Sequence, residues 1–246
     1  MTTLVVGASG ATGRLLVRQL LERGEAVRII VRSAAALSEQ IINHENISVT
    51  EASLLALSDK ALAKQVEGCD AITSCLGHNL SFKGIFGPPY QLVTEATKRL
   101  CKAVVSNQKH PVKFVLMNTA GNINHDLSEQ VSLKEKIVLS LLRTLIPPHA
   151  DNERAADFLR TQIGQNNPAI EWVAVRPDGL INESEVSEYT LWPSPTRSAI
   201  FDAGSTSRIN VGHFMAELIT RPELWQEWKG KMPVIYNKAS ENTAFE

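Results

Sequence analysis

The feature that most constrains this sequence is a glycine-rich loop near its N-terminus, Gly7-Ala8-Ser9-Gly10-Ala11-Thr12-Gly13. The loop directly follows the apolar run Thr3 to Val6 and leads into an amphipathic stretch from Thr12 to Arg23. Glycine at these three positions permits a tight turn out of a strand, close approach of the backbone to a ligand, and close packing of the next helix. The start of that helix offers unpaired N–H groups and a partial positive charge to phosphate. A glycine-rich turn without a ligand is the alternative, but the strand–loop–helix context favours a dinucleotide site.

The remaining sequence alternates short apolar runs with longer amphipathic ones, a pattern typical of βαβ units and a parallel sheet. Right-handed crossovers between such units predict a Rossmann-type, doubly wound α/β fold, with ligands at the carboxyl ends of the strands. We expect one domain over residues 1–246, in which residues from about 180 to 246 form a small C-terminal, substrate-side subdomain. The expected strands are Thr3–Val6, Ala26–Val31, Ile47–Thr50, Ala71–Cys75, Lys113–Met117, Trp172–Val175 and one near Val234. The expected helices are Thr12–Arg23, Ser58–Glu67, Tyr90–Asn107, Asp151–Ile163 and Val211–Thr220.

The end of the second expected strand bears on which cofactor the loop would bind. An NAD site usually places Asp or Glu about 20 residues beyond the loop, where the carboxylate holds the ribose 2′-hydroxyl. This sequence instead has Arg32 followed by Ser33. A planar guanidinium suits a 2′-phosphate, so we expect NADP(H), with NAD(H) as the alternative. A solvated surface arginine is the other interpretation of Arg32.

Charge and composition limit the other classes of partner. The formal net charge is -1, from 25 basic and 26 acidic residues, which offers no attraction for nucleic acid or an anionic membrane. No apolar run is long enough to span a bilayer and no signal peptide is evident, so we expect a cytoplasmic protein. The three cysteines form no CxxC pair, which favours buried, reduced thiols. The six histidines show no metal-ligand spacing, so no metal site is expected.

Several segments together resemble the atypical short-chain dehydrogenase/reductase superfamily, and within it the NmrA-like and biliverdin/flavin-reductase-like NAD(P)-binding proteins. They are the glycine loop, Val31-Arg32-Ser33, Leu76-Gly77, Trp172 to Pro177 and Ser207 to Met215. The resemblance implies that Ser53 and Leu54 contact adenine, although many members have Asp at the position of Ser53. It also implies that Leu76 and Gly77 line the ribose and pyrophosphate path. Thr119 and Ala120 would lie beside the nicotinamide, and Pro177 to Leu180 would close over it.

The usual catalytic residues of short-chain dehydrogenases are missing. The serine position reads Asn118-Thr119-Ala120-Gly121, and the Tyr-x-x-x-Lys positions read His149 and Glu153. Hydride transfer to a flavin or quinone needs no such set, because solvent can supply the proton. Thr119 and His149 are then the candidate catalytic residues. Their structural alternatives are a strand-end hydroxyl that satisfies the backbone, and a histidine that caps or precedes the next helix.

Two further features stay open at this stage. His78 and Asn79 follow the Leu76-Gly77 turn and are placed to face the pocket. An apolar helical stripe before Pro147-Pro148 is compatible with a lid over apolar rings, a dimer face or a helix packed in the core. Its members are Leu133, Ile137, Val138, Leu141, Leu142, Leu145 and Ile146.

The sequence supports an NADPH-dependent oxidoreductase that transfers hydride to a flavin-like, quinone-like or other conjugated small-molecule acceptor. A non-catalytic, NmrA-like regulator that senses NADP(H) is the alternative. A nucleotide-sugar epimerase or dehydratase is disfavoured by the missing tyrosine and lysine. Either a monomer or a homodimer is compatible with the sequence.

Overall fold

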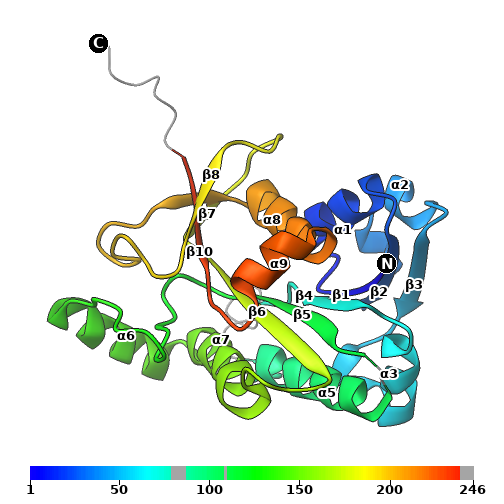
Figure 1. Cartoon of the computed structure of the whole chain (residues 1–246), viewed down its shortest axis with the longest axis horizontal. Coiled ribbons are helices and arrows are strands. Elements are labelled where there is room, and N and C mark those ends of the chain that lie inside the picture. The colour runs from blue at the N-terminus through cyan, green and yellow to red at the C-terminus, as the bar shows by residue number, and fades with distance from the viewer. Residues whose placement is uncertain (79–86, 108–109, 239–246) are drawn as a thin grey trace.

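The protein is built around a central, mostly parallel sheet (Figure 1). The structure is a computed structural model that describes residues 1–78, 87–107 and 110–238. The sheet has eight strands in the order β3-β2-β1-β4-β5-β6-β10-β8. Strands β1 to β6 are the first six strands expected from the sequence. The strand expected near Val234 is β10, which runs parallel to β6. This topology confirms the doubly wound α/β fold. The strands are β1 (Thr2–Val6), β2 (Ala26–Val31), β3 (Ile47–Glu51), β4 (Ala71–Ser74), β5 (Val112–Met117), β6 (Ile170–Pro177), β8 (Tyr189–Trp192) and β10 (Val234–Asn237).

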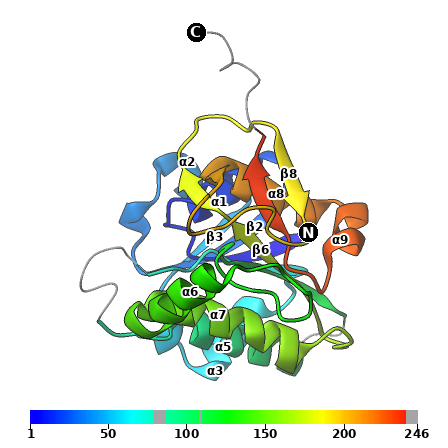
Figure 2. The ribbon, with the colours of Figure 1, turned by 90° about the vertical axis from the view of Figure 1, so that its left-hand side faces the viewer.

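Helices cover both faces of the sheet, and each face has its own apolar core (Figures 1 and 2). On one face lie α1 (Gly13–Glu22), α2 (Glu39–Ile42), α8 (Arg208–Thr220) and α9 (Pro222–Trp228). On the other lie α3 (Asp59–Val66), α5 (Leu92–Asn107) and α7 (Pro147–Phe158). Short helical turns join them at η1 (Ala34–Ala36), η2 (Leu54–Ala56) and η3 (Leu159–Ile163). Within the described residues, no helix has the length and apolarity needed to cross a membrane.

The helix expected from Asp151 to Ile163 begins earlier than predicted. It starts at Pro147, and its last five residues form a separate π-helical turn, η3. Proline fits the first helical position because its missing N–H would have no partner there. The prediction that His149 precedes this helix is therefore wrong, since His149 lies within its first turn.

The C-terminal third is divided between the main core and a smaller unit. β8 and β10 extend the main sheet, and α8 packs so closely on α1 that a Cβ on Gly212 would lie 3.0 Å from the backbone nitrogen of Leu16. β7 (Gly179–Ile181) and β9 (Ser205–Ser207) pair in a separate two-stranded sheet. The substrate-side subdomain expected from about residue 180 thus shares the main core through α8, α9 and β10.

The apolar stripe before Pro147 forms helix α6 (Leu133–Leu145), which lies at the edge of the molecule (Figure 1). Leu133, Ile137, Leu141 and Leu145 are all exposed along it. Glu135 and Leu139 are the buried residues of this helix. The interpretation of α6 as a core-packing helix is therefore wrong for most of the stripe.

The glycine loop fixes where α1 starts relative to β1. A Cβ at Gly13 would lie 2.1 Å from the carbonyl oxygen of Gly7, and Gly7 itself has a φ of +77°. A Cβ at Gly7 would lie 2.5 Å from the carbonyl group of Cys75, at the end of β4. Helix α1 can therefore approach the sheet only because these two positions lack side chains.

We predict that Gly13→Ala lowers the free energy of unfolding by about 2 kcal/mol or more, because backbone atoms at 2.1 Å cannot move aside as a side chain would. Alanine would gain about 1 kcal/mol of helix propensity over glycine, which is too little to offset this overlap. Chemical denaturation measures the change. Gly77→Ala is the control, because a Cβ at Gly77 meets nothing within 4 Å. Equal stability of the Gly13→Ala variant and the wild type would contradict the account of the loop.

Candidate functional site

The glycine loop presents a set of backbone donors at the N-terminus of α1. Gly10 donates its N–H to the carbonyl oxygen of Gly7 at 3.0 Å, which closes the turn. Among the residues that the structure describes, none accepts a hydrogen bond from the N–H groups of Ser9, Ala11, Thr12 or Gly13. Unpaired N–H groups at a helix start, together with the helix dipole, form an anion-binding site. This is the geometry that a bound diphosphate requires.

A cavity of about 640 Å³, which we call the glycine-loop groove, runs along the carboxyl ends of β1, β2 and β4. The loop contributes Gly7, Ser9 and Gly10 to its wall. The other expected cofactor residues that line it are Arg32, Ser53, Leu54, Leu76 and Gly77. The structure thus brings together residues from four separate segments of the sequence.

Other residues expected at the cofactor lie outside this lining. Ala11, Thr12, Gly13 and Ser33 do not line the groove. Thr12 and Gly13 are buried under the loop, and the Thr12 hydroxyl forms no capping hydrogen bond. Thr12 and Gly13 would therefore contribute to an anion site at the N-terminus of α1 through their unpaired N–H groups and not through side chains. Ser33 is exposed at the start of η1.

Arg32 is an exposed cation at the end of β2 and lines the glycine-loop groove. Its guanidinium makes no hydrogen bond or ion pair with any residue in the described ranges. Several other arginines of the chain are engaged, as Arg18 is with Glu22. Arg32 is therefore free to meet an anionic group in the groove.

The segment after β5 carries the first candidate catalytic residue. The buried Asn118 accepts a hydrogen bond from the N–H of Thr119, and its own side-chain NH₂ donates to the carbonyl of Asn152 in α7. The Thr119 hydroxyl oxygen accepts a hydrogen bond from Gly121 N–H at 3.3 Å. Ala120 N–H donates to the carbonyl of Pro177, a buried residue at the end of β6. Thr119 thus satisfies the backbone, and its hydroxyl hydrogen is still available to a ligand.

The second candidate, His149, lies next to the first. A Cβ at Gly121 would be 3.5 Å from His149 Cε1 and 3.7 Å from Thr119 Oγ1, so both side chains flank this glycine. His149 Nε2 is 3.4 Å from a carboxylate oxygen of Glu153, one turn along α7, without hydrogen-bond geometry. Arg143 from α6 binds the same carboxylate through two nitrogens, at 2.5 and 2.9 Å.

Glu153 is therefore a carboxylate held between two nitrogen-bearing side chains. Burial alone would raise the pKa of Glu153, but the adjacent imidazole of His149 and the hydrogen bonds and charge of Arg143 outweigh it and lower that pKa to about 2. Glu153 is ionised at neutral pH, and it links α7 to α6 beside the candidate catalytic residues.

His78, which the sequence placed facing the pocket, pairs with a buried carboxylate of α7. Its Nε2 lies 2.8 Å from the buried Asp151 carboxylate, and the side chain is buried. The same carboxylate accepts hydrogen bonds from the N–H groups of Val93 and Thr94 and so caps the start of α5. His78 thus anchors the segment after β4 to α7 and α5. Asn79, expected beside it, lies outside the described residues.

A buried arginine, Arg176 of β6, organises the loops on the substrate side. It forms an ion pair with the buried Glu129 at 2.7 Å and donates to the carbonyls of Asn122, Met232 and Pro193. These contacts connect the loop after β5, the segment before β10 and the loop after β8. Sequence reasoning noted Arg176 only as part of a motif, since its partners are distant along the chain.

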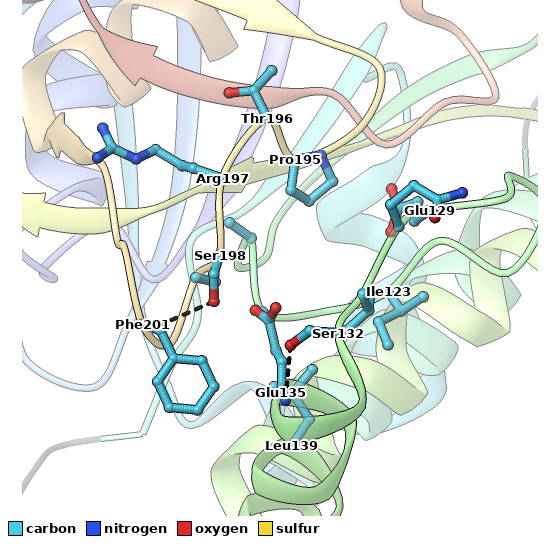
Figure 3. Close-up of a pocket in the computed structure, with 15 residues that line it drawn as sticks. Ile123, Glu129, Ser132, Glu135, Leu139, Pro195, Thr196, Arg197, Ser198 and Phe201 are labelled. Carbon is cyan, nitrogen blue, oxygen red and sulfur yellow. Dashed lines mark hydrogen bonds between the residues drawn. The ribbon is translucent and has the colours of Figure 1, made fainter.

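A second cavity, of about 390 Å³, lies between those loops and the start of α6, and we call it the α6 pocket (Figure 3). Ala120 and Gly121 form the wall nearest Thr119 and His149. Leu139 and Phe201 contribute apolar surface, and Glu135 contributes a carboxylate. The three buried cysteines and the described histidines form no cluster with acids of the kind that holds a metal, in the part of the chain that is described.

Comparisons with known proteins agree with this geometry. A family model described as NAD(P)H-binding matches residues 7–222, whereas no curated protein sequence matches the chain. A short-chain dehydrogenase/reductase from Veillonella parvula DSM 2008 in complex with NADP is 17% identical, with a TM-score of 0.68 over 99% of this chain and 96% of that one.

Two reductase structures are similar to the same degree. A protein from Streptococcus pneumoniae TIGR4, provisionally named an NADH-flavin reductase, is 17% identical, with a TM-score of 0.65 over 97% of this chain and 100% of that one. An anaerobilin reductase from Escherichia coli O157:H7 is 14% identical, with a TM-score of 0.68 over 99% and 100% of the two chains. At these identities the likeness demonstrates a shared fold.

We predict that Glu153→Gln lowers the free energy of unfolding by about 1–2 kcal/mol at pH 7, because it removes a partly buried charge pair. The lowered native pKa means that this stabilisation is complete above pH 4.5 and is lost as the pH falls toward 2. Denaturation curves of both proteins between pH 2 and 7 measure the difference.

Glu188→Gln is the control, since Glu188 pairs with Lys238 on the surface and is 78% exposed. We expect that variant to match the wild type throughout. A stability difference for Glu153→Gln that stays constant down to pH 2 would contradict the assigned role of its charge.

Proposed function

This chain belongs to the NAD(P)H-binding family, and from that premise we propose that it is an oxidoreductase that uses NADPH to reduce a conjugated, flavin-like or quinone-like small molecule. The observation that carries the proposal is that one groove is lined both by the loop, whose N–H groups at and after Ser9 are unpaired, and by the unpaired Arg32. The names of the flavin and anaerobilin reductases that share the fold support the type of acceptor.

The residues of the glycine-loop groove fit a dinucleotide. The loop would hold the diphosphate through the N–H groups of Ser9, Ala11, Thr12 and Gly13. Ser53 and Leu54 would contact adenine, and Leu76 and Gly77 would line the ribose. Arg32, with Ser33 beside it, would bind the 2′-phosphate, which is the basis for preferring NADPH to NADH.

The reaction adds two hydrogens to the acceptor. When bound, NADPH supplies a hydride, which is one proton with two electrons. One further proton comes from water by way of His149, so that the products are NADP⁺ and the reduced acceptor. The chain contributes positioning: the loop between β5 and α6 and the end of β6 bring Thr119, Gly121 and Pro177 to one place.

We assign separate roles to the two candidate catalytic residues. The Thr119 hydroxyl would donate a hydrogen bond to the nicotinamide amide or to the acceptor, since its oxygen already accepts a hydrogen bond from the Gly121 N–H. His149 would hold the proton that the acceptor takes up, next to the ionised Glu153. Both side chains lie beside the wall of the α6 pocket, which is then the acceptor pocket.

The direct test is NADPH oxidation, followed by absorbance against a panel of flavins, quinones and simple carbonyls. We expect turnover with at least one conjugated acceptor and none with the simple carbonyls. Tight binding of NADPH without turnover of any acceptor would contradict the proposal and favour the NADP(H)-sensing regulator instead.

We predict that Arg32→Ala weakens NADPH binding by about 10- to 100-fold, the effect of losing a charge-assisted hydrogen bond, and leaves NADH binding unchanged. Isothermal titration calorimetry with both cofactors measures this. Arg18→Ala is the matched control, because Arg18 is an exposed arginine of α1 that pairs with Glu22 outside the groove. Equal loss of NADPH and NADH affinity in Arg32→Ala would overturn the assignment.

A further inference from the structure

The α6 pocket contains a buried carboxylate without a partner. Glu135 is 8% exposed, and none of the described residues forms a hydrogen bond or ion pair with its side-chain oxygens. In Figure 3 its carboxylate points away from α6, toward Ser198 on the opposite wall of the pocket. Its oxygens open into the pocket, so a ligand that enters there would replace the water around them.

The other charged residues of this pocket are already paired. Glu129 is held by Arg176, at 2.7 Å, and Arg197 binds Asp202 through two nitrogens. The lysines that flank Glu135 in the sequence, Lys134 and Lys136, are exposed. Among the described lining residues, the pocket therefore keeps one uncompensated negative charge, that of Glu135.

A structural role within α6 does not account for this carboxylate. Ser132 and Glu135 have the spacing of a capping box, in which each side chain would bind the backbone N–H of the other residue. Only half of that motif forms: the Ser132 hydroxyl accepts from Glu135 N–H at 3.2 Å, and no hydrogen bond from Ser132 N–H to the Glu135 carboxylate is present. The N-terminus of α6 favours a negative charge nearby, which explains why the carboxylate is tolerated. It does not explain why the oxygens turn into the cavity.

We propose that Glu135 selects the acceptor, by taking a hydrogen bond from a nitrogen-bound hydrogen of the substrate, most strongly when that nitrogen is cationic. The apolar walls at Leu139 and Phe201 would hold the rest of a flat, conjugated molecule. The same charge repels a carboxylate or phosphate placed in the pocket. The substrate class is therefore a planar molecule with N–H groups and no acidic group at this end.

This inference rests on the proposed function only for the statement that the pocket holds the acceptor. Binding at Glu135 can be measured without any turnover, with three small ring compounds of nearly equal shape: benzamidine (cationic), benzamide (neutral) and benzoate (anionic). Ligand-observed NMR titrations at pH 7 give the dissociation constant of each.

The wild type should bind benzamidine about tenfold or more tightly than benzoate, because one charge-assisted hydrogen bond is gained and one repulsion is avoided. In Glu135→Gln this preference should fall to about threefold or less, with benzoate binding improved. A purely structural role for Glu135 would not weaken benzamidine binding and improve benzoate binding at the same time.

Glu95→Gln is the matched control, since Glu95 also lies in the first turn of a helix, α5, but its side chain is half exposed, pairs with Lys98 and lies outside the pocket. We expect it to keep the wild-type preference. The melting temperature of Glu135→Gln should stay within a few degrees of the wild type, because the carboxylate has no hydrogen-bond partner to lose and only its attraction to the N-terminus of α6 is removed.

The inference is overturned if the wild type binds neither benzamidine nor benzamide, or if it does not prefer benzamidine to benzoate. It is also overturned if the Glu135→Gln variant keeps the wild-type preference. These outcomes are separable from failure of the proposed function. A preference that depends on Glu135, in a protein that oxidises no NADPH, would contradict the oxidoreductase and leave the pocket assignment intact. Turnover of NADPH together with an unchanged ligand preference in Glu135→Gln would support the oxidoreductase and contradict the role of Glu135.

Discussion

The close approach of Gly13 to the carbonyl of Gly7 is the constraint on which the rest of the structure depends. It sets the start of α1 against the end of β1, and it does so at a distance that no residue with a side chain could tolerate. The N–H groups of Ser9, Ala11, Thr12 and Gly13, which lead into α1, have no acceptor among the described residues, and Ser9 lies in the wall of the glycine-loop groove. One short segment thus serves packing and offers donors, because its glycines let α1 approach the sheet and its N–H groups, as at the start of any helix, lack an intrahelical acceptor.

Buried charges connect this arrangement to the substrate side. Asp151 of α7 caps α5 and holds His78, so the segment after β4 is tied to the helix that carries His149. Arg176 joins three loops around its ion pair with Glu129. Residues from distant parts of the sequence therefore keep fixed positions at the carboxyl edge of the sheet, which is the preorganisation that the proposed hydride transfer needs. Glu135, unlike these groups, has no partner within the described chain, and for that reason we assign it to a ligand.

The central strands and the position of the glycine loop could be predicted from the sequence, since both follow from local patterns. An apolar run, three glycines and an amphipathic run are enough to predict β1, the loop and α1. Arg32 and its setting were also predictable, because an end of a strand and a missing acid are local features.

Features that depend on long-range contacts could not be predicted. The stripe of α6 has the periodicity of a core helix, yet Leu133 and Leu141 are exposed because no other described element covers that face. The Ser132–Glu135 spacing predicts a capping box, and only the three-dimensional structure reveals that the carboxylate turns away. The partners of Arg176 lie as far as 56 residues away along the chain, so no local pattern indicates them.

Nuclear magnetic resonance of the ¹⁵N-labelled protein, titrated with NADP⁺, tests the central claim most directly. The account predicts that the amide signals of Ser9, Ala11, Thr12 and Gly13 shift most strongly, since these N–H groups would exchange water for phosphate oxygens. Saturable binding that leaves those four signals in place, or no binding at all, would contradict it.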